Sequence, residues 1–211
     1  KFLLPTRSES RKRCENDRFV FFPLQYPIES RLTTISPEFF DQRFVIEYLA
    51  RILPHDVHLF VKQHPNHVGY QSPKLLLEIS NRHNVRFLHP DMNTHEVIEN
   101  ADLVTVINNT VGFEAIYHRV PLLVLGTAFY EQVPAATNVD DLSELPELIA
   151  ENIGETTPEE TTIESIYSLQ KASIPDLYWD VRKGKGRSEL DGEIDEVVDV
   201  IVDIMQDETQ L

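Results

Sequence analysis

The sequence predicts an α/β fold, in which helices cover both faces of a Rossmann-like parallel sheet of about five strands. Two observations support this fold class. Short apolar runs alternate with amphipathic helical patterns from residue 18 to residue 125, and each run is apolar almost throughout. Such runs are typical of parallel strands that are buried on both faces, and the helices between them imply right-handed crossovers.

The strands follow from the apolar runs, which end at polar or turn-forming residues. We expect them at residues 18–25, 57–63, 85–88, 103–107 and 121–125. The first helix is expected from Ser36 to about Leu53, because Ser36 is a capping residue type and Pro37 suits the first helical position. Its apolar face should include Phe40, Phe44, Tyr48 and Leu49. Further helices are expected at residues 73–83, at residues 94–100 and from Thr110.

Beyond Gly126 the pattern predicts helices only, at residues 140–153, 158–171 and 189 to about 205. The last of these has an apolar face opposite a row of carboxylates, so it packs either on this domain or on a partner domain. We therefore divide the chain into three parts: a basic N-terminal segment or linker at 1–17, a Rossmann-like core at 18–134 and a C-terminal helical extension at 135–211.

The composition excludes several classes of protein. A formal net charge of −16 makes this an acidic protein and argues against nucleic-acid binding, which needs clustered Lys and Arg. No apolar run reaches the ~18–20 residues that a membrane-spanning helix requires. Cys14 is the single cysteine, which suits a reducing cytoplasm. The chain begins without methionine or a signal peptide pattern, so we expect it to be a piece of a longer protein.

The segment from Val104 to Gly126 predicts an anion-binding turn between a strand and a helix. Asn108 and Asn109 form a polar turn, and the helix that follows should direct its free amides at Thr110, Val111 and Gly112 toward a phosphate. Gly112 is expected to let the ligand approach the backbone. Glu114 is placed to accept hydrogen bonds from sugar hydroxyls. In the alternative interpretation, the turn only caps the helix and Glu114 only complements its dipole.

Polar residues follow other strands of the expected sheet as well. Because ligands bind beyond the carboxyl ends of parallel strands, these residues should converge on one cleft. His64 can donate from a ring nitrogen to a phosphate. Lys62 lies either on the same side as His64 or in solvent. The other expected contacts to the sugar or to the cleft are Gln25, Glu29 and Tyr130.

Three stretches of the chain resemble a known family. They are FPLQYPIES followed by a helix with Asp41-Gln42, then LFVKQHP, then ADLVTVINNTVGFEAIYHRVPLLVLGTAFY. Together they look like the capsule polysaccharide synthesis family, which includes Kdo transferases and is similar in architecture to GT-B glycosyltransferases. The resemblance covers roughly residues 18–134. It implies half of a GT-B architecture, namely the C-terminal domain that holds a nucleotide-sugar donor, CMP-linked sugars being one class.

The resemblance also implies roles for individual residues. His64, Asn109 and Thr110 would hold the donor nucleotide and its phosphate, and Glu114 would contact the ribose. No metal and no other cofactor is expected, and the catalytic residues are not assigned. The acceptor, a growing or lipid-linked saccharide, would bind a separate N-terminal domain, so this half would be inactive alone. We expect it in the cytoplasm, with the inner face of the membrane as a possible peripheral location.

Two other functions remain open from the sequence. One is a nucleotide-sugar epimerase of the same architecture, which uses acidic and histidine side chains in a similar cleft. The other is a non-catalytic module that binds nucleotide-sugars or regulates a partner. Because all three follow strand ends, we also expect His64, Thr110 and Glu114 to line a single pocket, although they are far apart in the sequence.

Overall fold

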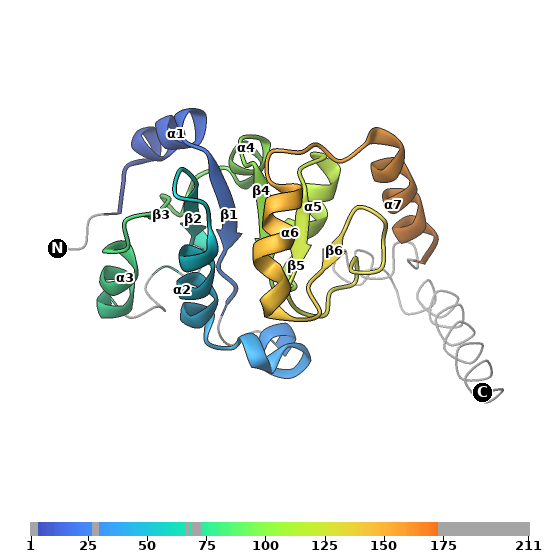
Figure 1. Cartoon of the computed structure of the whole chain (residues 1–211), viewed down its shortest axis with the longest axis horizontal. Coiled ribbons are helices and arrows are strands. Elements are labelled where there is room, and N and C mark those ends of the chain that lie inside the picture. The colour runs from blue at the N-terminus through green and yellow to red at the C-terminus, as the bar shows by residue number, and fades with distance from the viewer. Residues whose placement is uncertain (1–3, 27–29, 66–67, 69–72, 173–211) are drawn as a thin grey trace, which may run out of the picture. The chain divides into compact units, whose positions relative to one another are not determined.

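The computed structural model describes residues 4–26, 30–65, 68 and 73–172. Its centre is a six-stranded, fully parallel sheet in the order β3-β2-β1-β4-β5-β6 (Figure 1). The α/β parallel-sheet prediction is therefore confirmed, and the strand order is that of a doubly wound Rossmann sheet. The strands are β1 Phe19–Pro23, β2 His58–Lys62, β3 Val85–Phe87, β4 Leu103–Val106, β5 Leu122–Val124 and β6 Thr137–Asn138.

The sixth strand corrects the prediction of five strands and of helices only after Gly126. β6 pairs in parallel with β5, with Leu123 opposite Thr137, and the Val139 amide continues the pairing by donating to Val124 O. The sheet therefore extends past residue 134. β6 carries no apolar run, because it is only two residues long and half of it is exposed at the sheet edge.

Seven α-helices lie in the described part of the chain. They are α1 Arg7–Asn16, α2 Gln42–Ile52, α3 Pro73–Ser80, α4 Thr94–Glu99, α5 Val111–Tyr117, α6 Leu145–Asn152 and α7 Glu159–Ala172. Three short turns of helix accompany them, at η1 Arg31–Ile35, η2 Pro37–Phe39 and η4 Leu142–Glu144. None of the described helices is long and apolar enough to cross a membrane. The helix expected at 189–205 lies outside the described residues.

The single helix expected from Ser36 to Leu53 is broken into η2 and α2. Asp41, not Ser36, caps α2, because its side chain accepts from the Arg43 amide at 3.2 Å. Phe44 lies away from the buried face of α2, which includes Val45, Ile46 and Leu49, and it is 50% exposed. Phe40, which precedes α2, is also exposed, whereas Leu49 is fully buried as expected.

Two layers of helices cover the sheet. One hydrophobic core joins buried residues of α2, α3 and α6 to alternate residues of the strands, among them Val20 and Phe22. Because side chains alternate along a strand, Phe19 and Phe21 point to the opposite face. There α5 contacts β4 and β5, and α4 packs beside α5. Phe19 also stacks on Phe60, with ring centroids 4.2 Å apart.

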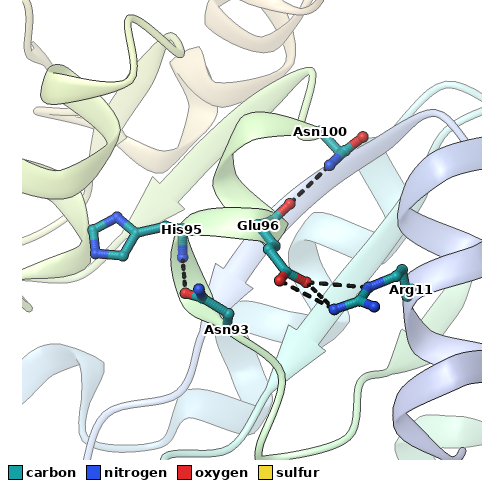
Figure 2. A network of polar contacts seen from close by, with 5 residues as sticks. All are labelled: Arg11, Asn93, His95, Glu96 and Asn100. Atoms are coloured by element: carbon teal, nitrogen blue, oxygen red, sulfur yellow. Dashed lines mark hydrogen bonds and ion pairs between the residues drawn. The ribbon is translucent and has the colours of Figure 1, made fainter.

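The basic N-terminal segment contains a helix, α1, that packs on the domain. Thr6 and Glu9 make a capping box at the start of α1. Ser10 is fully buried, and its hydroxyl accepts from the His89 amide at 2.9 Å. Figure 2 shows the second tie, in which the Arg11 guanidinium faces the Glu96 carboxylate of α4 at 2.8 Å. Ser10 and Arg11 thus attach α1 to the segment after β3 and to α4.

Cys14 lies on the buried side of α1 and gives a simple test of this packing. It is 4% exposed, and burial raises the pKa of its thiol to about 12. We expect no reaction with a thiol reagent at about pH 8 until the protein unfolds, because the thiolate is the reactive form. Labelling across a urea titration, compared with labelling in full denaturant, measures this protection. Rapid labelling of the native protein would show that α1 does not pack as described.

Candidate functional site

The candidate site is a cleft of about 790 Å³ at the carboxyl ends of β1 and β4. In the strand order of this sheet, β1 and β4 are where the direction of chain winding reverses, which is the usual ligand site of such a fold. The volume lies within the ~300–1,000 Å³ typical of ligand pockets. The residues expected from the sequence that line it are Gln25, Lys62, His64, Asn109, Thr110, Val111 and Glu114.

His64, Thr110 and Glu114 therefore share one cleft, although they follow different strands. His64 comes just after β2 and is exposed at the cleft, and Thr110 is exposed directly before α5. Glu114 is half-buried in the first turn of α5. Glu29, which the sequence also suggested, lies outside the described residues.

The turn after β4 is built around Asn109. Its side-chain amide donates to Pro23 O at 3.3 Å, which ties the turn to the end of β1. Its side-chain oxygen accepts from the Val111 amide at 3.1 Å, and its backbone oxygen accepts from the Gly112 amide at 3.2 Å. The amides of Val111 and Gly112, expected to be free for a phosphate, are thus already engaged. Asn109 shapes the turn, and the Thr110 side chain is left facing the cleft.

Gly112 and Tyr130 do not contact the cleft, contrary to expectation. A Cβ on Gly112 would lie 2.6 Å from Tyr130 Cε2, so the glycine makes room for a tyrosine rather than for a ligand. Tyr130 is fully buried, and its hydroxyl donates to the backbone oxygen of Asn109. Tyr130 therefore supports the turn from behind and is shielded from any ligand.

Asn108 also lies behind the cleft, in a buried chain of amides and hydroxyls. Its side-chain oxygen accepts from Gln25 Nε2 at 2.5 Å, and its amide donates to Ser36 Oγ at 2.9 Å. Ser36 Oγ accepts as well from the Thr127 amide, at 3.2 Å. Gln42 holds the other end, because it accepts from the Gln25 amide and donates to Gln25 O. This chain connects the segments that follow β1, β4 and β5, so it fixes their relative positions.

Lys62 is the buried cation of the cleft. It is the last residue of β2, it is 6% exposed, and its Nζ donates to Thr94 Oγ1 at 3.2 Å. Burial lowers the pKa of Lys62, and the charges of Glu114 and Asp91 partly oppose this shift. Of the two sides open to Lys62, the structure selects the cleft. A buried cation that is held by one hydroxyl keeps donor capacity for an anionic ligand.

Asp91 and Thr94 are cleft residues that the sequence analysis missed. Both lie after β3, and Thr94 is the first residue of α4, whose cap Asn93 is drawn in Figure 2. The rule used for the other strands would have found Asp91, because it is a polar residue just beyond a strand end. Among the described side chains, no group of three or more His, Cys, Asp or Glu is placed to hold a metal ion.

Comparison with solved structures finds proteins of similar fold. The Escherichia coli structure described as trehalose-6-phosphate bound with UDP-2-fluoro glucose aligns with a TM-score of 0.52 and 15% identity, over 81% of this chain and 44% of that one. KpsC of Thermosulfurimonas dismutans, a beta Kdo 2,7 transferase, aligns with a TM-score of 0.49 and 18% identity, over 77% of this chain and 62% of that one.

Comparison of sequences defines the family. Residues 6–140, more than half of the chain, match the model of the capsule polysaccharide biosynthesis proteins. The capsule polysaccharide export protein KpsS of Escherichia coli is 28% identical over 92 residues, which make up 41% of this chain and 23% of KpsS. The chain thus corresponds to only part of the length of the relatives that it matches. It belongs to the capsule polysaccharide biosynthesis family.

Proposed function

We propose that this domain binds the nucleotide-sugar donor of a glycosyltransferase that makes capsule or surface polysaccharide. The observation that carries the proposal is the position of Lys62, a buried cation at the ligand site of a Rossmann-like sheet, with His64 and Thr110 on the same cleft. Membership of the capsule polysaccharide biosynthesis family supports this proposal. The volume of the cleft suits a nucleotide-sized ligand.

In this proposal each polar group of the cleft has one role. Lys62, His64 and the Thr110 hydroxyl bind the phosphate, where charge-assisted hydrogen bonds are strongest. Glu114 accepts hydrogen bonds from the ribose hydroxyls. Asn108 and Tyr130 do not touch the donor and instead hold the turn at Asn109 in place.

The same groups favour the chemical step. Negative charge develops on the phosphate as the bond to the sugar breaks, and cations fixed in advance stabilise that charge. No metal ion is required, because Lys62 and His64 stabilise the negative charge on the phosphate. An acceptor-binding domain closes over the donor, excludes water and supplies the catalytic base. This domain alone binds the donor without transferring it, and it works in the cytoplasm, where the inner face of the membrane gives access to lipid-linked acceptors.

The test is a binding titration with CMP-, UDP-, GDP- and dTDP-linked sugars in the presence of EDTA. We expect one class to bind the wild-type domain, and His64→Ala to weaken that binding by about 1.5–3 kcal/mol, the range for a hydrogen bond to a charged group. His55→Ala is the matched control, because His55 is exposed before β2, at the opposite edge of the sheet. Equal affinity of the folded His64→Ala protein would remove His64 from the site. Binding that depends on a divalent ion would overturn the metal-free mechanism.

A further inference from the structure

Gln63 is a buried side chain without hydrogen-bond partners on the wall of the cleft. It is 4% exposed, and neither its Nε2 nor its Oε1 has a partner. Gln25, also on the cleft wall, is 5% exposed and has an unpaired Oε1. Three of the six unpaired buried side-chain atoms in the described part of the chain thus belong to these two residues. Buried polar atoms are nearly always paired, so such a cluster points to a ligand.

The fold fixes the Gln25 side chain and places Gln63 at the cleft. Gln25 is fixed at its backbone by Gln42, and its Nε2 is occupied by Asn108, so only its oxygen is left for a ligand. Gln63 directly follows β2, and its neighbours Lys62 and His64 line the same cleft. The end of β2 and the two residues after it therefore place a cation, a carboxamide and an imidazole on the same cleft.

The chemistry of a carboxamide indicates which part of a ligand it recognises. Phosphate is bound best by charged donors, and sugar hydroxyls by carboxylates, and the cleft has both. A carboxamide offers one donor and one acceptor side by side in a plane. That arrangement matches the edge of a nucleobase, where an acceptor and an N–H lie next to each other, as in the bidentate pairing of Gln with adenine.

We propose that Gln63 is a specificity residue that reads the edge of the donor's nucleobase through two parallel hydrogen bonds. The Gln25 oxygen accepts a further N–H or O–H from the same nucleoside. This inference rests on the proposed function, because it assigns a base-recognition role within the same cleft. It also explains why the Gln63 amide and the Gln25 side-chain oxygen stay unpaired in the protein alone, since their partners arrive with the ligand.

The test separates the base from the rest of the ligand. Wild-type protein and Gln63→Met, which is similar in shape but has no amide, are titrated with CMP, UMP, AMP, GMP and ribose 5-phosphate. We expect the wild type to prefer at least one nucleotide over ribose 5-phosphate, and Gln63→Met to lose about tenfold or more of that preference. Its affinity for ribose 5-phosphate should stay the same. Gln132→Met, at an exposed glutamine outside the cleft, is the control.

A stability measurement gives a second readout. Replacing an unpaired buried amide by an apolar group of similar shape should leave the melting temperature of the free protein unchanged or raise it, whereas loss of a structural hydrogen bond would lower it.

A second variant tests the amide donor alone. Gln63→Glu, which keeps the acceptor and removes the donor, should also lose the nucleotide preference.

The outcomes distinguish this inference from the function on which it rests. A wild-type protein that binds none of the nucleotides overturns both. Nucleotide binding with the same preference in Gln63→Met, or an equal loss of affinity for ribose 5-phosphate, overturns the role of Gln63 and leaves the proposed function standing.

Discussion

Gly112→Ala is expected to lower the free energy of unfolding by about 1–3 kcal/mol, the usual cost of overpacking a core. The added methyl group would lie 2.6 Å from Tyr130 Cε2 and closer still to the tyrosine hydroxyl. Tyr130 is fully buried, so its ring has no free space to move into. Either the ring shifts and loses its hydrogen bond to Asn109 O, or the first turn of α5 moves. Both responses displace Asn109 and Thr110, so nucleotide affinity should fall as well.

Intrinsic helix propensity predicts the opposite sign. Alanine inside a helix is more stable than glycine by roughly 0.5–1 kcal/mol, so a Gly112→Ala protein as stable as the wild type would rule out the steric account. Urea unfolding of both proteins measures the difference. A double-mutant cycle with Tyr130→Leu identifies the cause, because the cost of Gly112→Ala should shrink once the ring is gone. Additive costs would place the clash elsewhere.

The part of the site that the sequence predicted depends on one topological rule. Parallel strands end at the same edge of a sheet, so polar residues after β1, β2 and β4 had to meet there. This rule brought Gln25, His64 and Thr110 to one cleft without knowledge of any contact. The rule predicts at which edge of the sheet each residue lies, but it does not predict whether the side chain points into the cleft. Asp91 was missed only because the rule was not applied to β3.

The direction of a side chain depends on packing partners that are distant in the sequence. The sequence cannot tell whether Gly112 makes room for a ligand or for another side chain, and here Tyr130, from beyond β5, fills the space. Ser36 carries the sequence signal of a helix cap. Its hydroxyl instead turns inward to Asn108 and Thr127, and α2 begins only at Gln42.

Packing partners that are distant in the sequence also decide which side chains are buried and which residues pair as strands. Phe44 was expected to face the core because of its spacing in a helix from Ser36, but Val45, Ile46 and Leu49 form the buried face of α2 and Phe44 is half exposed. Thr137 and Asn138 pair as β6 because β5 leaves a free edge, not because their residue types favour a strand. Local patterns therefore identified the elements with a strong apolar signal, and tertiary contacts decided the rest.

Lys62→Met is expected to weaken nucleotide binding by about tenfold or more, because a hydrogen bond from a cation to phosphate contributes on the order of 1.5–3 kcal/mol. The loss has a second cause. Without the ammonium group, the charges of Glu114 and Asp91, which act on Lys62 in the free protein, oppose the phosphate. Titration calorimetry with the nucleotide that the wild type prefers measures the change. Lys62→Arg should keep most of the affinity, so an equal loss in both variants would indicate packing rather than charge.

The lowered pKa of Lys62 adds a dependence on pH with a defined sign. Burial disfavours the charged amine in the folded protein, so Lys62 loses its proton at a lower pH than the usual 10.5. Nucleotide affinity should therefore fall as the pH rises through the folded pKa, while a phosphomonoester is already dianionic above about pH 7. For folding the sign is reversed. Between the folded pKa and 10.5 the unfolded chain binds more protons, so the contribution of Lys62 to stability rises with pH.

Nucleotide affinity and folding stability should thus change in opposite directions with pH, and each measurement is a control for the other. Affinity measured from neutral pH to about pH 10 should decline in the wild type and stay nearly flat in Lys62→Arg, whose guanidinium keeps its charge. Urea unfolding over the same range should show the wild type gaining stability relative to Lys62→Met. A decline of affinity that persists unchanged in Lys62→Arg would assign the pH dependence to another group. The phosphate would then have to be held by His64 and Thr110 without the buried cation.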